Sequence, residues 1–236
     1  MQHRNLLLSV IEPVDLAELS PFLREMPLYA GQTLCEPGDP VDLVYFPSSC
    51  SIAVITVTTD GHDVETASVG FEGAAGVLPA ISGVASPSRL QVQIGGGAVA
   101  LAASSLRDQV HRSAALMNAV LLFAQADTVQ THQTAACCAV HHLRARLARC
   151  LLTCEDRVGR STIVLTQDDM GLMAGALRSS ISLTASEFKD AGLIRYSRGR
   201  VEILDRSGLE RAACSCYRDG RKDGADLRRA PASRAA

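Results

Sequence analysis

Two cysteine and histidine pairs stand at helical spacing in the middle of the chain. Cys137 precedes His141 by four residues, and Cys138 precedes His142 by four. Residues four apart share one face of a helix, so each pair could offer a sulfur and a nitrogen ligand to a metal ion or a haem. The alternative is that these cysteines are small buried hydrophobic residues without a metal. We favour that alternative, assign no metal site, and find no cofactor that the sequence requires.

The other cysteines form no pattern typical of a zinc or redox centre. The chain has eight cysteines, and none of them forms a CxxC pair. Cys150 and Cys154 share a helix face, where a disulfide is geometrically awkward, and Cys214 stands close to Cys216. No apolar run is long enough for a membrane span, and no signal peptide is evident. We therefore expect a cytoplasmic protein with reduced thiols and no membrane partner.

Motifs of common catalytic sites are missing from the sequence. There is no GxSxG nucleophile motif and no HExxH metal motif. A β-roll enzyme of the cupin type would need histidines and carboxylates clustered on strands, and the strand-rich region offers only His62. We therefore predict that the protein is not an enzyme and has no catalytic residues.

Charge is divided unevenly along the 236 residues. Residues 1–138 carry 5 basic and 13 acidic side chains, a net charge of −8, and residues 139–236 carry 18 and 12, a net charge of +6. The formal net charge of −2 would by itself argue against a nucleic-acid partner. A basic C-terminal half beside an acidic N-terminal half reopens that possibility.

The residue composition and apolar pattern of the first half predict short helices followed by many short strands. Residues 1–27 fit one or two short helices. From Tyr29 to Ser105, glycine and proline are frequent and short apolar runs alternate with turns. Asp60-Gly61 between β-branched runs predicts a hairpin with a two-residue turn, in which both residues have a positive φ.

A long helical region follows the strands. Ser113 is a suitable N-cap, and no glycine or proline occurs from there to Cys154, which predicts one long helix or two helices with a slight break. Asp127 is the only formal charge between Ser113 and Leu143. A helix without a charged face is expected to bury its surface against other parts of the protein, and a second copy of the chain is the simplest partner for it.

The last third predicts a helix, a turn, a second helix and a hairpin. Thr166-Gln167-Asp168-Asp169 is typical of a capped helix start, and Gly175 supplies the turn. A second helix is expected from about Leu177 to Ala191, and the strands 193–196 and 200–204 follow. This order is the winged helix-turn-helix layout, whose second helix fits the major groove of DNA.

These residues carry a resemblance to the Crp/Fnr family of bacterial transcription regulators over roughly residues 5–217. In the strand-rich half the family pattern stands as Gly31-Gln32-Thr33-Leu34, Gly38-Asp39 and Tyr45-Phe46-Pro47. In the C-terminal half it stands as Arg146-Leu147-Ala148-Arg149, Asp156-Arg157-Val158-Gly159, Leu165-Thr166-Gln167 and Ala191-Gly192-Leu193-Ile194-Arg195-Tyr196. The ending Cys214-Ser215-Cys216-Tyr217 matches one branch of the family.

The resemblance implies an α+β fold with an N-terminal β-roll of the cyclic-nucleotide-binding type, a long dimerisation helix and a C-terminal winged helix-turn-helix. The expected domains are a β-roll effector-sensing domain with N-terminal helices at 1–112, a dimerisation helix and hinge at 113–154, a DNA-binding domain at 155–217 and a disordered tail at 218–236. The implied partners are double-stranded DNA with a palindromic operator, a second copy of the chain, an unknown small-molecule effector and RNA polymerase.

The effector pocket implied by the resemblance departs from the pattern of cyclic AMP binders. Its expected residues are Gly73, Ala74, Ala75, Gly76, Ser88 and Arg89. Ala74 stands where cyclic AMP binders have a glutamate, and Arg89 is displaced by one position, which turns a strand side chain to the opposite face. We therefore expect an effector other than cyclic AMP. Oxygen sensing through an iron–sulfur cluster is also unexpected, because the first cysteine is Cys35.

The resemblance places the base-reading residues at the start of the second helix. Arg178 stands at the position of a base-reading arginine, and the hydroxyls of Ser179, Ser180 and Ser182 follow. Phosphate contacts are expected from five further residues, namely Thr166, Gln167, Arg195, Arg198 and Arg200. For Arg198 and Arg200 the alternative is a solvated hairpin turn. The resulting hypothesis is a dimeric DNA-binding regulator. The alternative is a ligand-binding or protein-interaction module of the same fold with weakened DNA reading.

Overall fold

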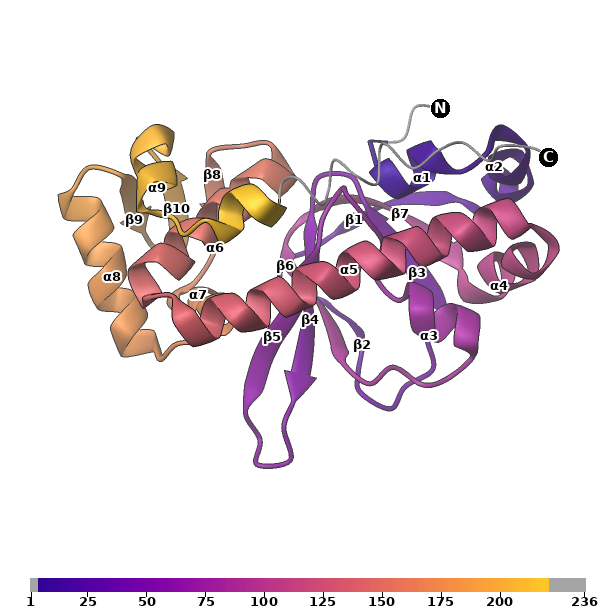
Figure 1. Ribbon diagram of the computed structural model, residues 1–236, viewed down its shortest axis with the longest axis horizontal. Helices are drawn as coiled ribbons and strands as arrows, with labels where there is room; N and C mark the ends of the chain where they lie inside the picture. The colour runs from indigo at the N-terminus through magenta and orange to yellow at the C-terminus, as the bar shows by residue number, and fades with distance from the viewer. Residues whose placement is uncertain (1–3, 221–236) are drawn as a thin grey trace.

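A computed structural model describes residues 4–220 of the chain. A strand-rich N-terminal domain and a helical C-terminal domain lie at opposite ends of the longest axis, and one long helix runs along both (Figure 1). Among the described residues, no helix combines the length and the apolar character that a membrane span needs.

The strands of the N-terminal domain form two antiparallel sheets with the orders β1-β7-β3 and β2-β6-β4-β5. These strands are β1 (Arg24–Leu28), β2 (Thr33–Cys35), β3 (Leu43–Pro47), β4 (Ser51–Val57), β5 (Asp63–Val69), β6 (Arg89–Ile94) and β7 (Gly96–Ala102). Side chains from both sheets share one core, including Leu28, Phe46, Ile52 and Val92. The predicted β-roll is confirmed.

Helices cover the ends of this domain. They are α1 (Leu6–Val10), α2 (Pro13–Leu19), the 3-10 turn η1 (Ser20–Phe22), α3 (Val77–Ser82) and α4 (Ala103–Arg112). The first strand begins at Arg24, ahead of the strand region that the sequence predicts from Tyr29. Proline at position 27 is compatible with this strand because β1 is an edge strand that pairs with β7 alone.

The hairpin of β4 and β5 is present, but its predicted two-residue turn is wrong. Thr58 N–H donates to the His62 carbonyl at 2.9 Å, and Gly61 N–H donates to the Thr58 carbonyl at 2.9 Å. Gly61 has a φ of +84°, whereas Arg198 is the only non-glycine residue with a positive φ among those described. Asp60 therefore keeps a negative φ, and the chain closes the hairpin with a longer loop in which glycine alone takes the left-handed conformation.

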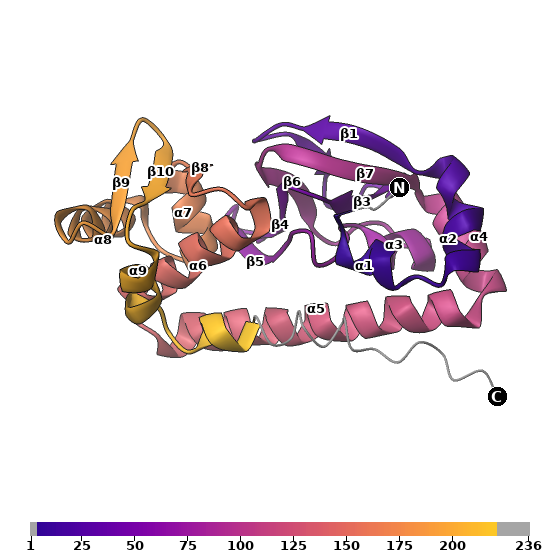
Figure 2. The same cartoon turned by 90° about the horizontal axis from the view of Figure 1, so that it is seen from above.

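The long helical region consists of α5 (Ala114–Val140) and α6 (Leu143–Val158), which confirms the broken alternative. Ser113 caps α5 by accepting a hydrogen bond from Leu116 N–H at 3.1 Å. His141 and His142 separate the two helices with extended ψ angles of 143° and 151°. Figure 2 shows that α5 runs beside the whole N-terminal domain and that α6 turns away from it into the C-terminal domain.

The C-terminal domain has the element order of a winged helix-turn-helix. Its elements after α6 are β8 (Thr162–Val164), α7 (Gln167–Ala174), α8 (Arg178–Asp190), β9 (Ile194–Ser197), β10 (Arg200–Ile203) and α9 (Arg206–Ala212). The strands form one small sheet, β8-β10-β9. Residues 216–220 are helical, and the rest of the expected disordered tail lies outside the described residues.

A buried arginine joins the two domains. The Arg157 side chain on α6 is 4% exposed. Its Nη1 and Nη2 donate to the Ser68 hydroxyl and the Ser68 carbonyl, each at 2.7 Å, and its Nε donates to Glu72 Oε1 at 2.7 Å. A Cβ on Gly70 would collide with Arg157 Cγ, so only glycine leaves room for this contact. The C-terminal domain is therefore attached to the end of β5.

Candidate nucleic-acid interface and effector segment

A capping box fixes the start of α7, the first helix of the helix-turn-helix. Asp169 N–H donates to Thr166 Oγ1 at 3.1 Å, and Thr166 N–H donates to Asp169 Oδ2 at 2.7 Å, as the sequence predicts. Gly175 ends α7 with a φ of +58°, a conformation that side chains other than glycine rarely adopt. Together the cap and the glycine set the angle at which α8 leaves α7.

Helix α8 has a buried face and an exposed face. Ile181, Ala185 and Phe188 are buried in the core of the C-terminal domain or beside it. The opposite face exposes Arg178, Ser179 and Leu183 to solvent. The periodicity of the sequence predicts this inward face, and the face left over is free to enter a groove of DNA.

The expected base-reading residues differ in their exposure to solvent. The Arg178 side chain is 68% exposed, and its Nη1 lies 3.1 Å from Asp168 Oδ2. An ion pair that exposed holds the guanidinium only weakly, so a base edge could replace the aspartate. Ser179 is exposed, whereas Ser180 and Ser182 are only partly so. Arg178 and Ser179 are therefore the strongest candidates for base contacts.

The hairpin of β9 and β10 forms a positively charged wing. Arg198 and Gly199 make its two-residue turn with φ angles of +49° and +72°. Arg195, Arg198 and Arg200 are exposed and line one surface hollow. Among the described residues that line it, Glu202 is the only acidic one. Arg195 Nη1 lies 2.7 Å from Glu202 Oε2, so Arg198 and Arg200 supply most of the positive charge that remains for phosphate.

Thr166 and Gln167 are less suited to phosphate than the wing. The Thr166 hydroxyl is already engaged, because it donates to Asp169 Oδ2 at 2.7 Å. Gln167 is partly buried, and the neighbouring Asp168 and Asp169 are acidic. The structure also places Thr166 in a hollow beside Gly31 of the N-terminal domain. Any phosphate contact here must overcome local negative charge.

The expected effector residues do not converge on one open pocket. Ala74 and Ala75 are 3% and 2% exposed. A Cβ on Gly73 would collide with Phe123 Cε2 of α5, so the aromatic ring closes that side. Tyr45 N–H donates to the Ala75 carbonyl at 3.1 Å, which fixes the segment to β3.

Arg89 faces away from this segment. Gly76 lies near the Leu90 side chain, which is buried on the core side of β6. Arg89 lies on the other face, where its Nε and Nη1 pair with Glu36 at 2.8 Å and Asp63 at 2.6 Å. Ser88 has its carbonyl hydrogen-bonded by the Ser86 hydroxyl at 2.7 Å. The one-position displacement of the arginine thus has the structural consequence expected from strand alternation.

A cavity of about 330 Å³ lies next to the segment, between the N-terminal domain, α5 and α6. Its lining includes Phe71, Glu72, Phe123, Asp127 and Arg157. Burial raises the pKa of the Asp127 carboxyl, and Arg157 partly offsets that effect. No motif in the sequence points to this cavity, although the isolated charge of Asp127 on an apolar helix is a signal for it.

Glu65 is a second titratable group at the junction of the domains that the sequence did not reveal. It lies on β5 beside α6 and α7 and accepts a hydrogen bond from the Gln93 amide. Burial raises the pKa of its carboxyl to about 7. Its charge therefore changes near neutral pH.

Comparison with known proteins identifies the type of the C-terminal domain and the fold of the chain. Residues 145–212 match the model of the Crp-like helix-turn-helix domain. No match was found among curated proteins.

Solved structures of regulators share the fold over most of the chain. FixK2 from Bradyrhizobium japonicum is 14% identical with a TM-score of 0.69, and the match covers 81% of this chain and 98% of FixK2. A CRP-family transcriptional regulator from Thermus thermophilus is 19% identical with a TM-score of 0.66, covering 80% of this chain and 96% of the regulator. The c-di-GMP responsive regulator CLP from Xanthomonas campestris is 13% identical with a TM-score of 0.64, covering 82% and 99%. The chain has the fold of Crp/Fnr transcription regulators and carries a Crp-like helix-turn-helix domain.

Proposed function

We propose that the protein is a dimeric, sequence-specific DNA-binding transcription regulator. The exposed face of α8 carries this proposal, because it presents Arg178 and Ser179 on a helix sized for the major groove. The exposed side chains of Arg198 and Arg200 on the wing support contacts to the phosphates beside that groove. A cytoplasmic location and RNA polymerase as a further partner belong to the same proposal.

The outer stripe of α5 supports dimerisation. One series of its exposed residues alternates at spacings of four and three, as in a heptad repeat, namely Ala114, Asn118, Leu121, Gln125, Thr128, His132, Ala135 and Ala139. Val129, Ala136 and Val140 are also exposed on α5. None of them carries a formal charge at neutral pH, and the alanines allow close approach of a second helix. A second copy of α5 fits this stripe. Two-fold symmetry would then present two α8 helices to palindromic half-sites about 34 Å apart.

We also propose that the effector differs from cyclic AMP. Ala74 supplies no carboxylate, Arg89 is paired with Glu36 and Asp63, and Phe123 lies against Gly73. The 330 Å³ cavity beside this segment has the size of a small-molecule site. The regulator CLP, which responds to c-di-GMP, has the same fold, so the fold is compatible with another effector. Calorimetric titration with cyclic AMP should give no affinity in the micromolar range or tighter, and such an affinity would contradict this proposal.

A protein-interaction or ligand-binding module is the second candidate, and the composition of α8 favours it. Leu177 and Leu183 are 77% and 71% exposed on the recognition helix. Leu177 also provides no side-chain cap for α8. These apolar residues could contact a protein, although Leu183 could equally contact a thymine methyl group.

Selection from a random pool of duplex DNA separates the two functions. The full-length protein should enrich a palindrome and bind it at least ~10³-fold more tightly than bulk DNA at the same salt concentration. Affinity should fall steeply as salt increases, because phosphate contacts release counterions. Arg178→Ala should relax the enrichment at one base pair of each half-site, whereas Arg211→Ala on α9, which is 73% exposed beside Asp205, should keep it unchanged. Equal enrichment of all sequences by the wild-type protein would favour the interaction module.

A further inference from the structure

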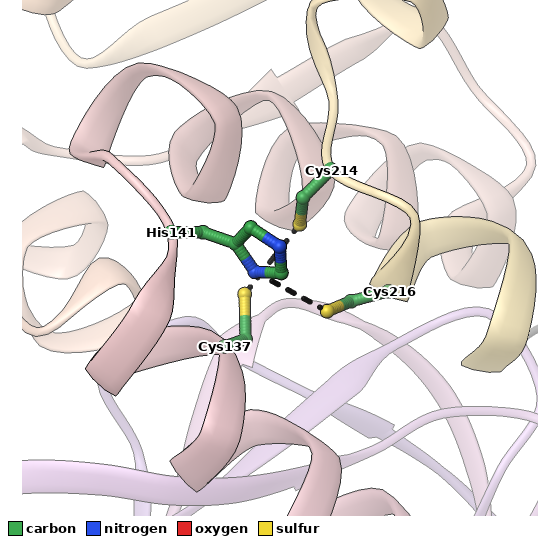
Figure 3. Close-up of side chains that lie close together, drawn as sticks. All are labelled: Cys137, His141, Cys214 and Cys216. Carbon is green, nitrogen blue, oxygen red and sulfur yellow. Dashed lines mark hydrogen bonds between the residues drawn. The ribbon is translucent and has the colours of Figure 1, made fainter.

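Four metal-binding side chains converge where α5 ends (Figure 3). Cys137 comes from the last turns of α5, His141 from the break before α6, and Cys214 and Cys216 from the segment that follows α9. One ligand atom from each residue lies within 4.8 Å of all the others. The cluster therefore joins parts of the chain that are far apart in sequence, and the Cys214-x-Cys216 pair completes the Cys137/His141 pair.

The spacing of the cluster matches a single tetrahedral ion. Cys137 Sγ and Cys214 Sγ are 3.5 Å apart, and Cys216 Sγ and His141 Nδ1 are 3.5 Å apart. Tetrahedral zinc with its usual bond lengths places two sulfurs about 3.8 Å apart and a sulfur and a nitrogen about 3.6 Å apart. An iron–sulfur cluster would spread the sulfurs more widely, because its cysteines bind different irons.

The surroundings of the sulfurs favour a cation. Cys137, Cys214 and Cys216 are 0%, 8% and 4% exposed. Gln133 Nε2 approaches Cys216 Sγ to 2.9 Å, a short donor contact that suits a thiolate acceptor.

Arg149 on α6 lies within electrostatic range of Cys137 and Cys214. Zinc with three thiolates and one neutral imidazole carries a net charge of −1, and a neighbouring arginine offsets that charge. Cys138 and His142, the second pair at helical spacing, do not share the cluster. His142 is exposed and is the N-cap of α6.

We propose that Cys137, His141, Cys214 and Cys216 bind one Zn²⁺ ion as a closed Cys3His site. The three thiols release their protons to solvent on binding, and the ion undergoes no redox change. The ion ties the break between α5 and α6 to the segment after α9. If the protein reads DNA as proposed above, zinc also fixes the direction in which each C-terminal domain leaves the dimerisation helix.

Metal analysis of the full-length protein, purified without chelator under reducing conditions, tests the site. The expected content is one zinc ion per chain for the wild type and less than about 0.1 for Cys214→Ser, Cys216→Ser and His141→Ala. Cys138→Ser and His142→Ala are matched controls on the same turn of chain and should retain zinc. Circular dichroism of each variant separates loss of the ion from loss of the fold.

Cobalt provides a second readout that does not depend on how much zinc survives purification. The reduced, metal-free wild type should bind one Co²⁺ per chain and develop the strong visible bands of tetrahedral thiolate coordination, and Cys216→Ser should lose those bands. A wild type that gives no such bands would overturn the proposal. A native mass lower by two hydrogens, which would indicate a Cys137–Cys214 disulfide, would also overturn it. So would zinc that is retained by the double variant Cys214→Ser/Cys216→Ser.

DNA binding tests the role of the ion separately from its presence. The metal-free protein should bind the selected operator at least tenfold more weakly than the zinc form, and added zinc should restore the affinity. Equal affinity of the two forms would overturn the hinge role, while the metal content and cobalt bands still decide the site.

Discussion

The DNA-facing surface and the effector segment differ in how open they are. Arg178 on α8 is 68% exposed, whereas Ala74 and Ala75 of the effector segment are 3% and 2% exposed. Phe123 of α5 lies directly on Gly73. The fold thus keeps α8 accessible, while aliphatic and aromatic side chains close the segment in which the effector pocket was expected. In this fold the two surfaces are built from separate residues, so one can change while the other is kept.

A small number of polar contacts join the two domains. Arg157 holds the end of β5 through Ser68 and Glu72, and Glu65 lies beside the same junction. A ligand in the neighbouring cavity would meet Glu72 and Arg157 directly. A ligand can shift the balance between domain arrangements only by binding one of them more tightly, and these contacts give it the means.

Breaking the Arg157 contact should have the largest effect. The Arg157 side chain is 4% exposed, so its ion pair with Glu72 is largely shielded from water. Arg157→Met leaves Glu72 without its partner, and the free energy of unfolding should therefore fall by about 3–5 kcal/mol. Urea unfolding measures this loss. Arg211→Met, at a side chain that is 73% exposed, is the control and should change the stability by less than about 0.5 kcal/mol. Equal stabilities of the two variants would mean that the domains do not depend on this contact.

Removing Arg178, the arginine proposed to read a base, should have the next largest effect. Arg178→Ala should weaken binding to the selected operator by about 1–3 kcal/mol and relax the preference at one base pair of each half-site. Fluorescence anisotropy with single-base variants of the operator measures both. Lys189→Ala, at the far end of α8, should keep the base preference. A relaxed preference in Lys189→Ala but not in Arg178→Ala would show that another part of the helix reads the bases.

A smaller effect is expected from the wing. Arg198→Ala should weaken binding to all DNA sequences alike and reduce the slope of log affinity against log salt by about one. Its left-handed backbone calls for Arg198→Asn as a second variant, because asparagine tolerates the φ of +49°. A slope that stays unchanged in both variants would favour the solvated-turn interpretation.

The smallest effect is expected from the titration of Glu65. Its folded-state pKa of about 7 is higher than that of an unfolded glutamate, so the folded state binds the proton more tightly. The stabilisation is complete at acidic pH and is lost as the pH rises through about 7. The melting temperature of the wild type should therefore decline relative to that of Glu65→Gln between about pH 4.5 and about pH 7, and the difference should level off above that range. Parallel curves for the two proteins would contradict the assigned pKa.

Local sequence patterns predicted the elements of the C-terminal domain well. The capping box at Thr166, the turn at Gly175 and the inward face of α8 each depend on residues within a few positions of one another. The break at His141 and His142 has no such signal, because neither residue is a helix breaker by itself. The negative φ of Asp60 likewise depends on how β4 and β5 twist, not on the Asp-Gly pair alone.

Contacts between segments that are distant in the chain could not be predicted from the sequence patterns. Cys214 stands 77 residues after Cys137, so helical spacing singled out Cys137 and His141 but also the unrelated Cys138 and His142. The Arg157 contact spans 85 residues to Glu72. Which of these pairs meet is decided by how α6 turns back at the break after α5, and only the folded chain contains that information.

Footprinting of the selected operator tests the central claim most directly. Hydroxyl-radical cleavage of the complex with full-length protein should show two protected half-sites on one face of the duplex, about 34 Å apart, related by a two-fold axis. That pattern requires both an accessible α8 and a dimer built on α5. Protection of a single half-site, or uniform protection along the duplex, would contradict the account.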